Sequence, residues 1–125
     1  MDKPKDIRSR CLDFSVTMID FLESLKFTNA NKIISDQLLR SSCSIGANIT
    51  EAKSSSTLKE FKRFYEIALK SANESTYWLE ILQLKRSSNL VELQNSIKSL
   101  NMELAEISKI IAKSIITIKQ KLKTK

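Results

Sequence analysis

Residues 37–51, with the sequence QLLRSSCSIGANITE, carry the pattern that decides the fold. Four polar side chains recur in this stretch at steps of 4, 4 and 3: Arg40, Ser44, Asn48 and Glu51. Such steps place residues on one side of an α-helix, here within roughly 80° at about 100° per residue. An apolar row lies beside the polar row and consists of Ile34, Leu38, Ile45, Ile49 and Ala52. A polar row next to an apolar row should be partly buried, so its side chains need partners.

The polar row has a functional and a structural interpretation. Arg40, Asn48 and Glu51 would form a binding site in the first. In the second, the row is a network that fixes helix register or a subunit contact, and we favour this interpretation. Arg40 and Glu51 are eleven residues apart, roughly 16 Å along a helix at 1.5 Å per residue, so they cannot pair with each other. We expect Arg40 to pair instead with Glu74, which has apolar neighbours and needs a cation if it is buried.

The rest of the chain is also helical in pattern. Its 125 residues are 42% hydrophobic and include one Gly and one Pro, and such a scarcity of helix breakers favours long helices. Apolar spacing predicts helices over about residues 5–25, 30–53, 58–85 and 90–122. Thr28 or Asn29 would cap the second helix, and Ser56 or Thr57 the third. Short connections make neighbouring helices antiparallel, so we predict a single all-α domain over residues 1–125, an up-down-up-down four-helix bundle.

Gly46 is the single glycine and lies inside the second predicted helix. A glycine in a helix interior costs roughly 1 kcal/mol relative to alanine. The close approach of another backbone at this position would offset that cost.

The third and fourth predicted helices carry more apolar surface than one core needs. A heptad seam runs along the fourth helix and consists of Leu93, Ile97, Leu100, Leu104, Ile107, Ile111, Ser114 and Ile118. Five further apolar residues lie off this seam or in a second row of the third helix: Ile110, Ile116, Ile67, Trp78 and Ile81. Surplus apolar surface usually marks an interface, so these five residues predict a homo-oligomer. Trp78 could alternatively stack on a nucleobase, although its apolar neighbours favour packing.

Basic residues gather at the start of the third predicted helix and the end of the fourth. The formal net charge is +7, and no acid follows Glu106. The candidate nucleic-acid-binding residues are Lys59, Lys62, Arg63, Lys109, Lys113, Lys119, Lys121, Lys123 and Lys125. A basic surface suggests an anionic partner, RNA or DNA first, bound through its phosphates. The alternative is a solvated lysine-rich helix end, since cations favour a helix C-terminus.

The residue types needed for catalysis and metal binding are scarce. The chain has no histidine, the side chain best suited to proton transfer near neutral pH. Cys11 and Cys43 are too far apart to suggest a zinc site, and one glycine cannot form a phosphate-binding loop. We therefore expect no enzyme activity, no metal and no cofactor. The charged start has no secretory signal and no apolar stretch long enough for a bilayer, so we expect a cytoplasmic protein without a membrane partner.

The spacing of these polar residues resembles that of a known family, the four-helix-bundle proteins of the 23S ribosomal RNA intervening-sequence family. Those proteins typically show Q-L-x-R-x-x-x-S-I-x-x-N-I-x-E, then E-F-x-x-F-x-x-I-A and an S-x-x-E step. The first segment is matched by Gln37, Leu38, Arg40, Ser44, Ile45, Asn48, Ile49 and Glu51. The second is matched by Glu60, Phe61, Phe64, Ile67, Ala68, Ser71 and Glu74. The resemblance covers about residues 10–120 and departs at Gly46, where relatives often have a proline.

The resemblance implies a short, basic bacterial protein that assembles into a ring-shaped homopentamer. A similar bundle is the accessory protein of diversity-generating retroelements, which associates with a reverse transcriptase and nucleic acid. A reverse transcriptase or another protein is therefore an implied partner. Two functional hypotheses follow. The first is a non-catalytic oligomer that binds the backbone of RNA or DNA by charge, and the second is a protein-interaction scaffold or adaptor with no nucleic-acid role.

Overall fold

The computed structural model describes residues 5–85 and 90–124, and its regular structure within these ranges is entirely α-helical. The helices are α1 (Ile7–Glu23), α2 (Asn29–Lys53), α3 (Leu58–Leu84) and α4 (Val91–Lys123). The all-α class and the four helices expected from the apolar spacing are confirmed, with bounds that differ by at most two residues. None of these helices is long and apolar enough to cross a membrane.

Side-chain caps set the starts of the first three helices. Asp6, Thr28 and Thr57 each accept a hydrogen bond from the backbone N–H three residues further on, at 2.8–3.1 Å. The caps of α2 and α3 are therefore Thr28 and Thr57, and not the alternatives Asn29 and Ser56. An N-cap side chain is typically worth about 1 kcal/mol, which explains why α1 begins at Ile7, directly after Asp6.

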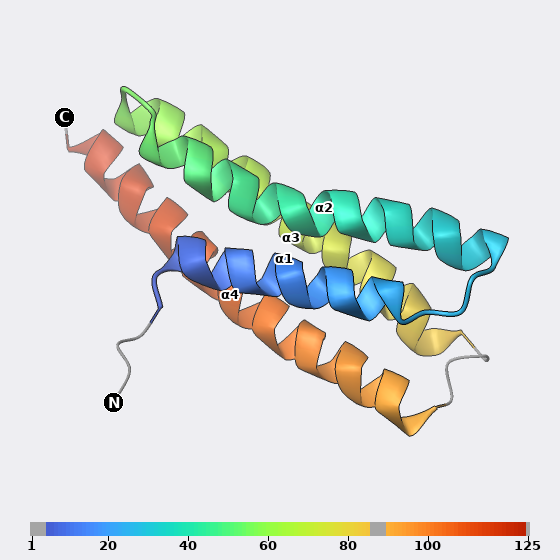
Figure 1. Cartoon of the computed structure of the whole chain (residues 1–125). Coiled ribbons are helices and arrows are strands. Elements are labelled where there is room, and N and C mark those ends of the chain that lie inside the picture. The colour runs from blue at the N-terminus through green and yellow to red at the C-terminus, as the bar shows by residue number, and fades with distance from the viewer. Residues whose placement is uncertain (1–4, 86–89, 125) are drawn as a thin grey trace.

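Consecutive helices run in opposite directions in Figure 1. The cross-helix hydrogen bonds of α2 and α3 follow this order, because Arg40 contacts Glu74 whereas Ser44 contacts Ser71. The α2–α3 connection and the end of α4 lie toward one side of the molecule, on the left in Figure 1. The α1–α2 connection, the end of α3 and the start of α4 lie toward the other side. The start of α3 and the end of α4 are thereby placed together.

The core lies between the inward faces of all four helices, and α4 supplies much of it. Its buried residues are Ile97, Leu100, Leu104, Ile107, Ile111, Ile115 and Ile118. The predicted seam is wrong at one position, because Ile115 is buried where Ser114 was expected and Ser114 is half-buried. A helix has 3.6 residues per turn, so a strict heptad repeat drifts by about 20° per heptad. At Ser114, three heptads after Leu93, this drift has turned the next residue, Ile115, into the core in place of Ser114.

Arg10 and Glu103 connect α1 to α4 through two parallel hydrogen bonds. Nη2 of Arg10 donates to Oε1 of Glu103 at 2.5 Å, and Nε donates to Oε2 at 3.2 Å. Both side chains are about one-third exposed. The hydrogen bonds that Arg10 donates to the Glu103 carboxylate raise the pKa of Arg10 above its ordinary value. Sequence spacing offered no sign of this pair, since the two residues belong to separate helices.

Candidate nucleic-acid interface

A shallow, open groove lies between the start of α3 and the end of α4, with a volume of about 420 Å³. The α3 wall contains Phe61 and Tyr65. The α4 wall contains Ile110, Lys113, Ser114, Thr117, Ile118 and Lys121. Two of the candidate lysines therefore line the groove, and none of its described lining residues is acidic.

The lysines at the end of α4 have no acidic partners in the part of the chain that the structure describes. The basic residues in ion pairs there are Lys5, Arg10, Lys32, Arg40 and Lys62. The exposed and unpaired lysines in the C-terminal half of α4 are Lys109, Lys113, Lys119, Lys121 and Lys123. Lys125, the last candidate, lies outside the described residues. The end of α4 is therefore a run of uncompensated positive charge.

The basic residues at the start of α3 have a different setting. Lys62 lies 3.7 Å from Glu66, one helical turn further on. Lys59 and Arg63 are exposed and share a shallow hollow with Glu66 and Glu60. Acidic neighbours thus offset part of the positive charge on α3, and the stronger positive field belongs to α4.

Phe61 and Tyr65 form an aromatic pair in the α3 wall of the groove. Their ring centroids are 4.6 Å apart and the rings are inclined by 23°. Tyr65 is 7% exposed, and its burial raises the pKa of the phenol above its ordinary value of 10.0. The hydroxyl therefore keeps its proton near neutral pH and remains a hydrogen-bond donor.

The polar row of α2 separates into three parts. Nη2 of Arg40 donates to Oε1 of Glu74 at 2.8 Å. Asn48 donates to the backbone oxygen and the Oγ of Ser44 at 2.8 and 3.0 Å, and Ser71 of α3 donates to the same Oγ. Glu51 is exposed, and its side chain has no hydrogen-bond or ion-pair partner within residues 5–85 and 90–124.

Arg40 pairs with Glu74 as expected, and the pair lies at the surface. The Arg40 side chain is 61% exposed and that of Glu74 is 36% exposed. The buried link between α2 and α3 is instead a pair of serines that the sequence analysis missed. Ser41 and Ser75 are both fully buried, and their Oγ atoms are 2.8 Å apart. Ser41 lies within the apolar row, a position at which a serine needs a hydrogen-bond partner.

Known proteins share the sequence pattern and the fold of this chain. A model of the 23S rRNA-intervening sequence proteins matches residues 4–113. The chain belongs to this family. A solved structure of a protein with unknown function, from the S23 ribosomal protein family of Bacteroides thetaiotaomicron, is 33% identical, with a TM-score of 0.75 over 88% of this chain and 98% of that one. No match was found among curated proteins.

The family match divides the basic end of α4. The matched region includes the polar row of α2, all of α3, Lys109 and Lys113, and it ends at residue 113. Lys119, Lys121 and Lys123 follow it. The α3 wall of the groove therefore lies inside the matched region, whereas most of its α4 wall lies beyond the end of the match.

The five residues predicted for an oligomer interface lie in different settings. Ile67, Trp78 and Ile81 are half-buried on α3, and Trp78 packs against the core. Nε1 of Trp78 is buried without a hydrogen-bond partner in the described part of the chain. Ile110 is half-buried and lines the groove, whereas Ile116 is exposed. Packing within one chain accounts for much of the Trp78 surface, and the interface itself stays a prediction.

α1 carries an exposed apolar row that the sequence analysis did not single out. Leu12, Val16 and Ile19 follow one another at steps of 4 and 3 and are 54%, 52% and 38% exposed. The buried row of α1, which includes Cys11 and Met18, occupies another face. The signal was present in the sequence, since α1 has apolar residues at helical spacing on two faces.

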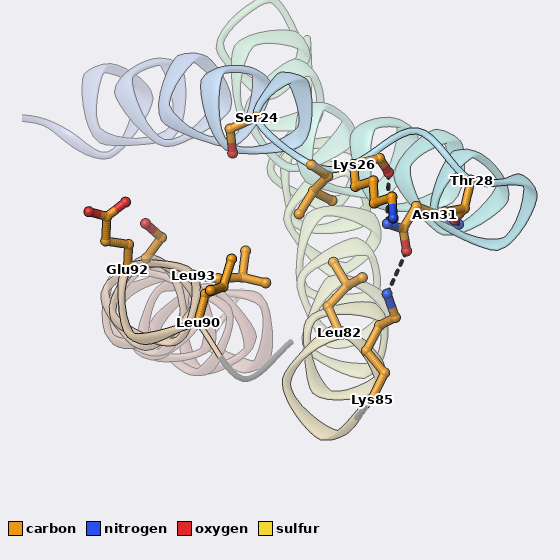
Figure 2. A pocket seen from close by; sticks show the side chains of 11 residues that line it. Ser24, Lys26, Thr28, Asn31, Leu82, Lys85, Leu90, Glu92 and Leu93 are labelled. Atoms are coloured by element: carbon orange, nitrogen blue, oxygen red, sulfur yellow. Dashed lines mark hydrogen bonds between the residues drawn. The ribbon is translucent and has the colours of Figure 1, made fainter. Parts of the chain in front are cut away.

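A larger cavity of about 620 Å³ lies at the opposite end of the molecule. Figure 2 shows Lys85 of α3 pointing toward Asn31 of α2, with Leu82 between them and α4. Nζ of Lys85 donates to Oδ1 of Asn31 at 2.8 Å, and Nδ2 of Asn31 donates to the backbone oxygen of Lys26 at 2.9 Å. These bonds tie the end of α3 to the α1–α2 connection. Glu92 also lines the cavity, so its charge is mixed.

Both cysteines of this family member are free thiols. Cys11 is buried, and this burial raises its pKa from 9.0 to about 11. Because the thiolate is the reactive form, Cys11 is unreactive near neutral pH. Cys43 is half-buried. The described residues contain no group of three His, Cys, Asp or Glu side chains that could hold a metal ion.

Proposed function

We propose that this protein binds RNA or DNA without catalysing a reaction, through phosphate contacts at the lysine-rich end of α4. The observation that carries the proposal is the run of five exposed lysines with no ion pair in the described residues. Lysines that neutralise phosphates release condensed counterions, which favours binding without regard to base sequence. Because consecutive helices run in opposite directions, Lys59, Lys62 and Arg63 at the start of α3 lie at the same end of the bundle as the lysines of α4.

The test is fluorescence anisotropy with a short labelled RNA and a DNA of the same sequence at low and moderate salt. The variant Lys113→Gln, Lys119→Gln and Lys121→Gln removes three charges from α4. The control variant Lys26→Gln, Lys32→Gln and Lys98→Gln removes three charges away from the C-terminal end of α4. Circular dichroism verifies that both variants remain helical.

We expect the wild-type affinity to fall steeply with salt for both nucleic acids. The α4 variant should lower the slope of log K against log salt by about 0.7 with single strands, or about 0.9 with duplex DNA, for each phosphate that a lysine no longer neutralises. The control variant should retain most of that slope. If the wild type does not bind at low salt, or if both variants bind as the wild type does, the scaffold hypothesis becomes the better one. The exposed row of Leu12, Val16 and Ile19 is the surface that favours a scaffold.

We also propose that the protein self-associates, and a ring of five is the state that the family resemblance implies. The support is the exposed apolar row of α1, which a second copy would cover. Five copies at +7 each would carry a formal charge of +35, and repeated weak contacts would then add avidity. Light scattering should return a mass several times 14.3 kDa. Val16→Glu should lower this mass, and Thr17→Glu, on another face of α1, should not. A wild-type monomer at micromolar concentration contradicts self-association.

A further inference from the structure

We infer that the groove between the start of α3 and the end of α4 receives an unpaired nucleobase, so that the protein prefers single-stranded nucleic acid to a duplex. This inference rests on the proposed function and adds the class of nucleic acid. A uniformly charged helix surface would bind the phosphates of either form. The groove offers additional contacts that only an unstacked base can reach.

The lining of the groove offers apolar contacts to a flat ring. Its volume of about 420 Å³ lies between two helices, and its apolar lining consists of Phe61, Tyr65, Ile110 and Ile118. Phe61 is half-buried, so part of the side chain faces solvent in the groove. Single-strand binders combine a positively charged groove with aromatic side chains that contact bases. In a duplex the base faces are covered by stacking and cannot enter such a groove.

Two lysines lie along the α4 wall. Lys113 and Lys121 are eight residues apart, roughly 12 Å along the helix at 1.5 Å per residue. A base that enters between them would place the phosphates on its two sides within reach of the two ammonium groups. None of the described lining residues is acidic, so no carboxylate of the lining repels the backbone.

The groove also holds polar atoms that can contact a base edge. Ser114 and Thr117 donate to the backbone oxygens of Ile110 and Lys113, each at 3.1 Å. Their hydroxyl oxygens therefore retain lone pairs that can accept. The hydroxyl of Tyr65 has no hydrogen-bond partner in the described residues and can donate. A few such groups hold a base without distinguishing one base strongly from another.

The experiment compares four probes with equal numbers of phosphates: a single-stranded RNA, a single-stranded DNA, a DNA duplex and an abasic DNA strand. Phe61→Leu keeps an apolar side chain but removes the aromatic ring. Phe64→Leu is the matched control, because Phe64 is another half-buried phenylalanine of α3 that packs against the core and does not line the groove. Thermal unfolding verifies that both variants are folded at the assay temperature.

We expect the wild type to bind both single strands about tenfold more tightly than the duplex or the abasic strand, in line with the effect of one base stacked on an aromatic ring. Phe61→Leu should remove most of this preference and leave the affinity for the duplex and the abasic strand unchanged. Phe64→Leu should retain the preference.

Equal binding of all four probes by the wild type overturns this inference and leaves the proposed phosphate binding intact. A loss of preference in Phe64→Leu equal to that in Phe61→Leu also overturns it. If the wild type binds none of the probes at low salt, the proposed function fails together with the inference.

Discussion

Gly46 of α2 lies directly against Cys11 of α1, and a Cβ added to Gly46 would be 3.0 Å from the Cβ of Cys11. The same added atom would lie 3.7 and 3.9 Å from the backbone C and Cα of Cys11. A Cβ is bonded to the backbone and cannot rotate away. The glycine therefore permits the close approach of two helices, which offsets its unfavourable helix propensity.

Gly46→Ala should destabilise the protein, although alanine is the better helix former by roughly 1 kcal/mol. Overpacking typically costs about 1–3 kcal/mol, so we expect a net loss of about 1 kcal/mol in urea unfolding. In a Cys11→Gly background the opposing Cβ is absent, and the same Gly46→Ala change should stabilise. A stabilising effect in the wild-type background would show that the helices separate without strain.

Arg10→Ala should destabilise the protein more than Arg40→Ala. Arg10 makes two hydrogen bonds to Glu103 and is 27% exposed, whereas Arg40 is 61% exposed. Exposed ion pairs are worth roughly 0–1 kcal/mol, and bidentate charge-assisted pairs are stronger. We expect about 1–2 kcal/mol for Arg10→Ala and no more than about 1 kcal/mol for Arg40→Ala in thermal unfolding. Equal effects would contradict this order.

Ser41 and Ser75 should show energetic coupling in a double-mutant cycle. Their Oγ atoms are 2.8 Å apart in the core, and a buried hydrogen bond contributes about 1 kcal/mol net. Ser41→Ala or Ser75→Ala alone leaves the other hydroxyl without this partner. We therefore expect the double variant to be less destabilised than the sum of the single variants by about 0.5–1 kcal/mol. Strict additivity in urea unfolding would indicate that the bond is absent in solution.

Stability should fall at alkaline pH because of Cys11. Its folded-state pKa of about 11 exceeds its ordinary value of 9.0, so the unfolded chain releases the thiol proton first. The contribution of the protonated thiol to stability is complete below about pH 9 and is lost as the pH rises through about 11. The loss is on the order of 2 kcal/mol.

The measurement for Cys11 is the melting temperature across this pH range in the wild type and in Cys11→Ala. Lysines and tyrosines titrate in both proteins, so the difference between the two curves isolates the thiol. Cys11→Ala should show the shallower decline. Parallel curves would mean that the thiol ionises equally easily in the folded and unfolded states.

Spacing along the chain determined the helices and the main apolar rows of this protein. The row from Leu38 to Ala52 and the scarcity of Gly and Pro are local features, and local features set helix formation. The basic end of α4 could also be predicted from the sequence, because the absence of acids after Glu106 is visible without a folded structure.

Only the tertiary structure decided how deeply each row is buried and which rows face one another. Glu74 has apolar neighbours along its helical row, yet its pair with Arg40 lies at the surface, since exposure depends on where the adjacent helix crosses. Ile115 replaces Ser114 because small angular drifts accumulate along a 33-residue helix. The groove brings Phe61 and Tyr65 of α3 close to Lys113 and Lys121 of α4. This proximity depends on how two helices pack against each other, and residue spacing within either helix does not encode that packing.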